Sequence, residues 1–200
     1  MGDDADDIIG LYRRHAAAWT AARGARLVER PWLDRFSGLL PPAASVLDLG
    51  CGSGVPIGRY FTDRGYAVTG LDSAPEMISL FRANLPDQDA LVGDMRALKL
   101  DRCFHGIVAW DSFFHLAHDH QRAMFAVYRD HALPRAALMF TTGPAFGVAI
   151  GTLEGDPLYH ASLDGAEYRG LLQQNGFEVV AQVNEDATCG GRTVWLARRR

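Results

Sequence analysis

Three glycines at alternate positions follow an apolar run that contains an acid. The segment reads Val46-Leu47-Asp48-Leu49-Gly50-Cys51-Gly52-Ser53-Gly54. An apolar run of this length is typical of a buried parallel strand. Glycine adopts backbone conformations closed to other residues and lets a ligand approach the main chain closely. Since residues 55–64 favour a helix, the glycines are expected in a strand-to-helix turn, where open α/β sheets bind ligands.

The spacing of these glycines separates two classes of cofactor. The dinucleotide fingerprint is G-x-G-x-x-G, and Val55 occupies the position of its third glycine. Asp48 lies two residues before the first glycine, where a carboxylate would repel a pyrophosphate but attract an ammonium group. The turn therefore favours a cationic cofactor over a dinucleotide. A turn that only bends the chain is the alternative.

Three more aspartates, Asp72, Asp94 and Asp111, each follow an apolar run. A single aspartate after a strand is more often a turn former or a helix cap. Because the carboxyl ends of parallel strands meet along one rim of a sheet, these acids and Asp48 are expected to lie close together. Four acids beside a glycine turn predict a pocket for a nucleoside-type cofactor.

Hydrophobic periodicity places these residues in a repeating strand–helix pattern. Helices are expected at residues 4–22, at 25–40 with a division at Pro31, and at 55–64, 75–84, 120–131 and 164–175. Strands are expected at 46–49, 67–71, 90–92, 106–110, 136–141, 177–183 and 193–197. The last two must be antiparallel because no helix separates them. Capping boxes are predicted at Ser73 with Glu76 and at Asp164 with Glu167, and Asp119 is expected to cap the helix that follows it.

This pattern predicts an α/β fold, a Rossmann-like, doubly wound, mostly parallel seven-stranded sheet with an antiparallel C-terminal hairpin and an N-terminal helical cap. The 200 residues are enough for one domain with a substantial core. We expect a single domain over residues 1–200. Its parts are a helical cap (1–44), a cofactor-binding βα core (45–141), a substrate-side loop (142–163) and a final helix with the hairpin (164–200).

Composition and charge argue against several function classes. The net charge of -4 at pH 7 disfavours nucleic-acid binding, which needs clustered cations. The cysteines Cys51, Cys103 and Cys189 match neither a disulfide framework nor a metal motif, which is typical of a reducing cytoplasm. We find no signal peptide and no apolar run long enough to span a bilayer. We therefore expect a cytoplasmic monomer or homodimer that binds neither nucleic acid nor membranes.

The pattern D-x-G-x-G-x-G resembles motif I of the class I S-adenosylmethionine (SAM)-dependent methyltransferases, and the resemblance extends strand by strand over residues 46–197. The chain looks most similar to the small bacterial enzymes that act on metabolites. The resemblance implies that SAM is the cofactor and S-adenosylhomocysteine the product. It also implies that the backbone of Gly50, Gly52 and Gly54 lies against the methionine part of SAM, and that Asp48 supports its ammonium group.

The same resemblance implies roles for the other strand ends. Asp72 would accept from both ribose hydroxyls, and Asp94 from the adenine amine. The Met95 N–H would meet a ring nitrogen, and the Trp110 carbonyl would accept from the ammonium group of SAM. The remaining residues of the predicted cofactor site are Cys51, Ser73, Met77, Asp111 and Tyr12, the last of which covers the methionine end unless it packs in the core.

Methyl transfer from a sulfonium mainly requires that nucleophile, methyl carbon and sulfur be aligned and water excluded. A general base is needed only if the nucleophile arrives protonated. The candidates are Asp111, His115 and His160. A loop histidine held by hydrogen bonds is the alternative for His115. No spacing among the histidines matches a strong metal motif, so no metal is expected.

The long segment 142–163 is expected to shape the acceptor site, because loops of this length are usually functional or mobile. Phe113, His115, Phe146, Tyr159 and His160 are predicted to line a partly apolar acceptor pocket. The alternative is a disordered surface loop.

The leading hypothesis is a SAM-dependent methyltransferase that acts on an O, N or C atom of a small molecule. An NAD(P)-dependent oxidoreductase on a similar sheet is the second hypothesis, which the missing third glycine and Asp48 disfavour. A non-catalytic SAM-binding partner protein is the third, because binding residues do not prove turnover. An RNA or protein methyltransferase is the fourth, which the acidic balance disfavours.

Overall fold

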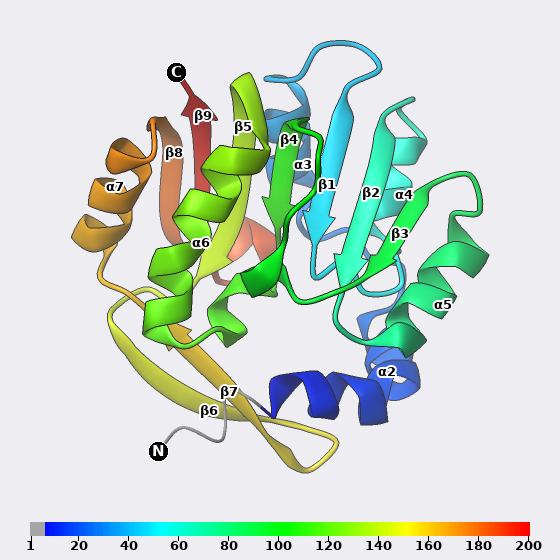
Figure 1. Ribbon diagram of the computed structural model, residues 1–200. Coiled ribbons are helices and arrows are strands. Elements are labelled where there is room, and N and C mark those ends of the chain that lie inside the picture. Colours follow the sequence, from blue (N-terminus) through cyan, green and yellow to red (C-terminus); the bar gives the residue numbers. More distant parts are fainter. Residues whose placement is uncertain (1–6) are drawn as a thin grey trace.

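The computed structural model describes residues 7–200, and its centre is a seven-stranded sheet (Figure 1). The strands are β1 (Ser45–Leu49), β2 (Ala67–Asp72), β3 (Asp89–Val92), β4 (Phe104–Ala109), β5 (Ala132–Thr142), β8 (Phe177–Asp186) and β9 (Arg192–Arg199). Their order is β3-β2-β1-β4-β5-β9-β8. The first five are parallel, whereas β9 runs antiparallel to both β5 and β8. The predicted mostly parallel sheet with an antiparallel C-terminal pair is confirmed.

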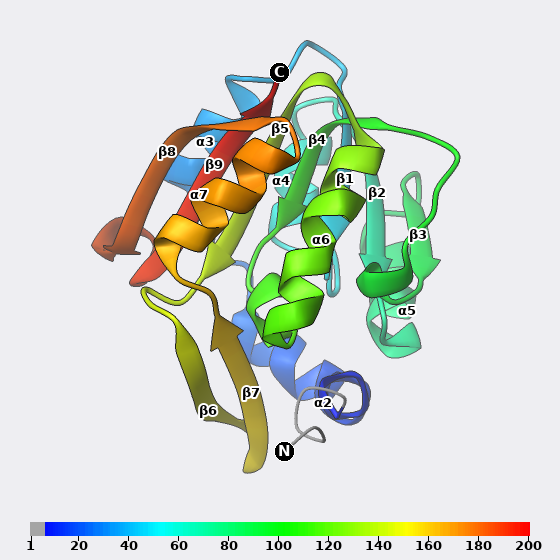
Figure 2. The ribbon, with the colours of Figure 1, turned by 60° about the vertical axis from the view of Figure 1, so that its left-hand side comes forward.

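Helices cover both faces of this sheet (Figures 1 and 2). On one face lie α3 (Arg30–Ser37), α4 (Ile57–Thr62) and α5 (Pro75–Asn84), and on the other α6 (His118–His131) and α7 (Gly165–Gln174). Strand alternation separates the two cores. Val46 and Val108 pack toward α3 and α4, whereas Leu47 and Ile107 pack toward α6 and α7.

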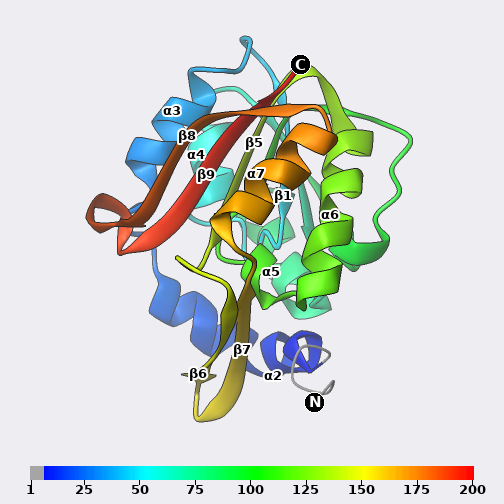
Figure 3. The same ribbon diagram turned by 90° about the vertical axis from the view of Figure 1, so that its left-hand side faces the viewer.

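Two further elements lie at the carboxyl ends of the parallel strands (Figures 1 and 2). They are the helix α2 (Ile8–Arg23) and an antiparallel hairpin of β6 (Gly147–Leu153) and β7 (Asp156–Ser162). Figure 3 shows the hairpin extending beyond the end of the main sheet. The first three residues of the predicted helix 4–22 lie outside the described part of the chain.

The prediction that residues 142–163 form an irregular loop is wrong, because most of them form the β6–β7 hairpin. Glu154 and Gly155 at its turn both have positive φ, 52° and 90°. Two-residue hairpin turns require this conformation, since it matches the twist of the flanking strands. Of the four glycines in this segment, Gly155 makes the hairpin turn possible.

Several predicted helix boundaries also need correction. Pro31 lies in the first turn of α3 and does not divide a longer helix, because proline lacks the N–H that a first turn leaves unpaired. The predicted capping box at Ser73 is wrong, since Ala74 precedes α5 and provides no side-chain cap. Asp119 lies inside the first turn of α6. Asp164 caps α7 by accepting from the N–H of Ala166, but Glu167, the predicted partner in a capping box, accepts from Arg122.

Three short 3-10 helices complete the structure: η1 (Met95–Ala97), η2 (Phe113–His115) and η3 (Ala187–Cys189). The first two follow β3 and β4 at the carboxyl rim of the sheet. Within residues 7–200, no helix combines the length and hydrophobicity that a membrane span requires.

Candidate active site

A cavity of about 1020 Å³, counting the space that opens to solvent, lies at the carboxyl ends of β1, β2 and β4. The strand order reverses between β1 and β4, and open α/β sheets bind ligands at such a switch point. The cavity is lined by Ile8, Ile9, Tyr12, Trp19, Arg23, Asp48, Gly50, Cys51, Gly52, Val55, Pro56, Ile57, Leu71, Asp72, Ser73, Met77, Gly93, Asp94, Met95, Arg96, Trp110, Asp111, Ser112, His115 and Leu116.

Two of the three predicted glycines face this cavity. Gly50 and Gly52 have φ of 73° and 53°, a left-handed conformation that favours glycine. A Cβ on Gly50 would lie 2.3 Å from the Cβ of Ser112. Gly54 does not line the cavity. A Cβ there would lie 2.7 Å from the Phe81 ring, so Gly54 provides room for α5 to pack.

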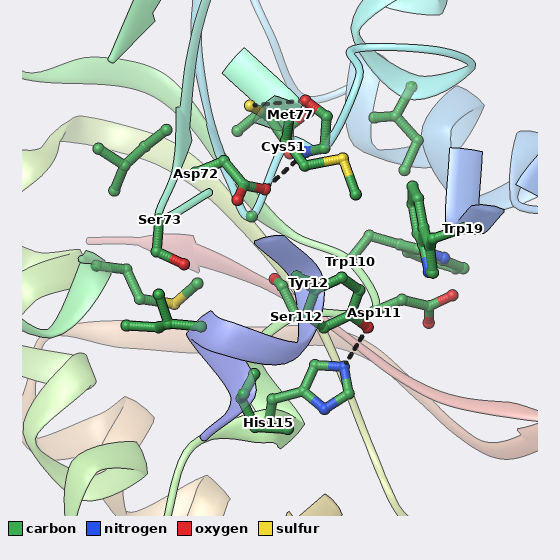
Figure 4. Close-up of a pocket in the computed structure, with 18 of the residues that line it drawn as sticks. Tyr12, Trp19, Cys51, Asp72, Ser73, Met77, Trp110, Asp111, Ser112 and His115 are labelled. Atoms are coloured by element: carbon green, nitrogen blue, oxygen red, sulfur yellow. Dashed lines mark hydrogen bonds between the residues drawn. The ribbon is translucent and has the colours of Figure 1, made fainter. Parts of the chain in front are cut away.

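Asp72 holds the glycine turn in place at the end of β2. Its Oδ2 accepts from the N–H of Gly52 and its Oδ1 from the N–H of Ala74, both at 2.9 Å. Figure 4 shows the carboxylate pointing into the cavity beside Cys51 and Ser73. Burial raises the pKa of Asp72, and the hydrogen bonds from the backbone partly counter that effect.

Asp48 lies at the floor of the cavity, where only 3% of the residue is exposed. Burial, together with the nearby charges of Asp72 and Glu29, raises the pKa of Asp48 to about 7. A positively charged ligand group would stabilise the ionised form of such a carboxyl group, because its charge offsets the cost of burying a carboxylate.

Asp94 pairs with Arg96 at the far end of the cavity. The Arg96 Nε donates to Asp94 Oδ2 at 2.8 Å, and the Arg96 backbone N–H donates to Oδ1 at 2.8 Å. Burial alone would raise the pKa of Asp94, but the hydrogen bonds and charge of Arg96 outweigh it and lower the pKa. Met77 and Met95 line the same end.

Asp111 follows β4 with a φ of 49°, and Arg192 of β9 binds its carboxylate in a two-pronged fork. The Nε–Oδ1 distance is 2.8 Å and the Nη2–Oδ2 distance is 2.7 Å. The Asp111 N–H donates to Thr141 Oγ1. Both carboxylate oxygens are thus occupied by a cation that lies 81 residues away in the chain.

His115 is fixed by hydrogen bonds on both ring nitrogens. Its Nε2 lies 2.9 Å from the Tyr12 hydroxyl (Figure 4). Its Nδ1 lies 2.8 Å from the carbonyl oxygen of Tyr159. Because a carbonyl only accepts, Nδ1 carries the proton and Nε2 accepts from Tyr12. Burial lowers the pKa of His115 to about 4, so the ring is neutral at pH 7. Burial, followed by the charges of Asp111 and Asp72, raises the pKa of Tyr12.

Of the five predicted acceptor residues, four do not line the cavity. Phe113 does not line a pocket: it is fully buried between Phe125, Tyr128 and Phe140, because η2 turns its ring toward α6. Phe146 is 58% exposed and stacks on His118. Tyr159 contributes its carbonyl to His115.

His160 lies beside the predicted site, with its ring centre 4.9 Å from that of His115. It lines a second, smaller cavity under the hairpin. Its own ring hydrogen-bonds backbone groups of Ala149 and Leu158 within the hairpin. Burial lowers the pKa of His160.

Asp156 of the hairpin contacts two side chains of α2. Asp156 Oδ2 lies 3.1 Å from Arg14 Nη2 and 2.9 Å from His15 Nε2. His15 has a non-helical conformation and marks a kink in α2. The Tyr12–His115 and His115–Tyr159 hydrogen bonds add to these contacts and join α2, η2 and β7.

Several residues that line the cavity were not predicted from the sequence, above all Trp19, Arg23 and Ser112. Trp19 lies 3.2 Å from where a Cβ of Gly52 would be. Ser112 donates to the Leu49 carbonyl at 2.6 Å and closes the floor. A signal existed for Trp19, which falls on the same helical face as Tyr12. Nothing local marked Arg23 or Ser112.

Among residues 7–200, no three His, Cys, Asp or Glu side chains lie close enough to hold a metal ion. His118 instead interacts with the carbonyls of Gly147 and Ser162, both at 3.1 Å.

Comparison with known proteins shows which sequences the chain resembles. Residues 46–134 match the family model described as a methyltransferase domain. A dTDP-3-amino-3,6-dideoxy-alpha-D-glucopyranose N,N-dimethyltransferase of Streptomyces fradiae is 33% identical over 125 residues, 57% of this chain and 48% of that protein. A malonyl-[acyl-carrier protein] O-methyltransferase of Serratia marcescens is 30% identical over 155 residues, 74% of this chain and 54% of that protein. The chain thus spans about half the length of the curated relatives it matches.

Solved structures show the same fold. SAM-bound CalS10, an amino pentose methyltransferase from Micromonospora echinaspora, is similar with a TM-score of 0.73 and 23% identity, over 93% of this chain and 96% of that one.

Proposed function

We propose that this chain, in which residues 46–134 belong to the methyltransferase domain family, is a SAM-dependent methyltransferase that acts on an O, N or C atom of a small molecule. The observation that carries the proposal is the acidic cavity above the left-handed glycine turn. Asp48, Asp72, Asp94 and Asp111 all line it, as the strand-end pattern predicts.

The residues present fit SAM. The ligand is a cationic nucleoside with hydroxyl and amine donors, and the carboxylates of Asp48, Asp72 and Asp94 line the cavity that would hold it. Asp72 would bind the ribose, Asp94 and Met95 the adenine, and Asp48 with the Trp110 carbonyl the ammonium group. Gly50 and Gly52 leave the space that a Cβ would fill. When bound, SAM supplies a methyl group on a sulfonium, from which a neutral thioether is a good leaving group.

The chain's own contribution to the chemistry is alignment and proton transfer. Tyr12 and His115 line the cavity together, and their hydrogen bond is aimed from the hydroxyl to the free lone pair of Nε2. A protonated acceptor that binds the Tyr12 oxygen would pass its proton to that oxygen as the Tyr12 proton moves to His115. We assign Asp111 to holding the Trp110 segment, because Arg192 occupies both of its oxygens.

The position of the hairpin supports the proposal that a small acceptor binds between α2 and β7. His160, Tyr159 and Phe146 would lie on the acceptor side. The relatives named for sugar-amine and malonyl carrier methylation support a small-molecule substrate. The free cysteines Cys51, Cys103 and Cys189 support a reducing compartment such as the cytoplasm. We propose a monomer or homodimer.

Calorimetric titration with SAM, and in parallel with NADH, tests the proposal. Micromolar binding of SAM without binding of NADH is expected. Binding of NADH alone would restore the oxidoreductase hypothesis. SAM binding without transfer of a labelled methyl group to any member of a broad acceptor panel would favour a non-catalytic SAM-binding protein.

SAM affinity is expected to rise with pH between about 5 and 7 and then level off. Asp48 is protonated below about pH 7 in the free protein, and the cofactor's cation favours its ionised form, so binding releases a proton. Titrations in buffers of different ionisation enthalpy measure the number of protons released when SAM binds. Asp48→Asn should abolish both the release and the pH dependence, and a wild-type affinity that does not change over this range would contradict the assignment.

The same carboxyl group affects the stability of the free protein. Its folded pKa of about 7 lies above the unfolded value of 3.8, so the folded state holds a proton that the unfolded state has released. The contribution of Asp48 to the free energy of unfolding therefore falls as pH rises from about 4 to 7.

A further inference from the structure

Arg23 lines the cavity, but the proposed function assigns no part of SAM to it. It is the last residue of α2. Tyr12, Trp19 and Arg23 all line the cavity, and the spacings of seven and four residues place them on one face of the helix. Tyr12 contacts His115, and Trp19 covers Gly52. Arg23 follows Trp19 by about one turn of the helix and therefore lies just beyond the Gly50–Gly52 segment.

A buried carboxylate holds the Arg23 guanidinium in one orientation. Glu29 is fully buried, and its Oε1 accepts from Arg23 Nη2. Arg23 Nη1 donates to the Arg26 carbonyl at 2.8 Å. A guanidinium has five N–H donors, so these two bonds leave donors for a ligand. Glu29 itself does not line the cavity, which places it behind the arginine.

Burial of this pair is costly, since a buried ion pair often fails to recover its desolvation penalty. The other oxygen of Glu29, Oε2, has no hydrogen-bond partner among the described residues. A pair needed only to join α2 to α3 would be served as well by apolar side chains of similar volume. The arrangement makes sense if the guanidinium itself is required at the cavity wall.

The other cation of the cavity wall is committed elsewhere. Of the described residues that line the cavity, two are arginines, Arg23 and Arg96. Both carboxylate oxygens of Asp94, itself part of the cavity wall, accept from Arg96. At the glycine-turn end, the acids Asp48 and Asp72 would repel an anion, so an anionic ligand group there depends on Arg23.

We propose that Arg23 binds the α-carboxylate of the cofactor and that Glu29 positions the guanidinium for it. This inference rests on the proposed function, since the ligand is SAM. It makes the cavity selective between SAM and decarboxylated SAM, which lacks only that carboxylate. Decarboxylated SAM carries one more net positive charge, so Asp48 and Asp72 alone would favour it. A preference for SAM therefore reports on the Arg23 contact.

Calorimetric affinities of SAM and decarboxylated SAM should be measured for the wild type and for Arg23→Gln, Glu29→Gln and Arg96→Gln. The wild type is expected to bind SAM at least ten-fold more tightly. Arg23→Gln should remove that preference by weakening SAM alone, and Glu29→Gln should reduce it in part. Arg96→Gln is the matched control, and it should change both affinities by the same factor.

Equal wild-type affinities for the two ligands would overturn the inference and leave the proposed function standing. An undiminished preference in Arg23→Gln would overturn it as well. Failure of both ligands to bind the wild type would overturn the proposed function, and the inference with it. If Arg23→Gln does not fold, as thermal unfolding would reveal, the wild-type comparison and Glu29→Gln decide, and an unchanged preference in Glu29→Gln rules out its positioning role.

Discussion

Replacement of Asp72 by asparagine is expected to weaken SAM binding by ten-fold or more, a loss of about 1.4 kcal/mol or greater. Each Asp72 oxygen already accepts a backbone N–H, one from Gly52 and one from Ala74. The NH2 group of asparagine cannot accept a hydrogen bond. One of the two backbone N–H donors and one ribose hydroxyl would therefore lose their acceptor. The substitution disturbs the glycine turn and the cofactor together. Calorimetric titration of both proteins with SAM measures the effect.

Asp89→Asn provides the matched control for this substitution. Asp89 begins β3 in the same sheet, pairs with Arg102 at 2.8 Å and does not line the cavity. Its variant should bind SAM within two-fold of the wild type. If Asp72→Asn binds SAM as tightly as this control does, Asp72 does not bind the ribose.

Replacement of His115 by alanine is expected to lower methyl transfer by about 100-fold at saturating SAM, within the usual range for a general base. The ring is neutral, its tautomer is set by the Tyr159 carbonyl, and its free lone pair accepts from Tyr12. Because the pKa of His115 is about 4, its protonation should not reduce the rate between pH 8 and 6. Turnover of labelled SAM, with an acceptor found by screening, measures the loss.

Two further variants separate proton transfer from structural support. Tyr12→Phe removes one oxygen of the proposed relay, and its effect should not add to that of His115→Ala, because the two residues act as a unit. His160→Ala is the control, since its ring bonds within the hairpin, and its effect should be smaller. Additive losses for Tyr12 and His115, or a greater loss for His160, would contradict the relay.

The succession of strands and helices along the chain and the acidic rim could be predicted from the sequence because they depend on local patterns. Period and spacing alone indicate a strand at Val46–Leu49, a glycine turn after it, and aspartates at the ends of the strands that follow. Parallel strands then bring their carboxyl ends together whatever the side chains between them are. The predicted fold and the cofactor-side residues of the cavity rest on that regularity.

The acceptor side of the site was decided by tertiary structure. Arg192 reaches Asp111 across 81 residues, and Tyr12 reaches His115 across 103. The turn at Glu154 and Gly155 makes a hairpin of an expected loop, and η2 buries Phe113 while it exposes His115 to the cavity. Arg23 and Glu29 are close in sequence, but only the packing of α2 and α3 buries one and turns the other toward the cavity. Such pairings depend on how elements meet in space, which no local spacing encodes.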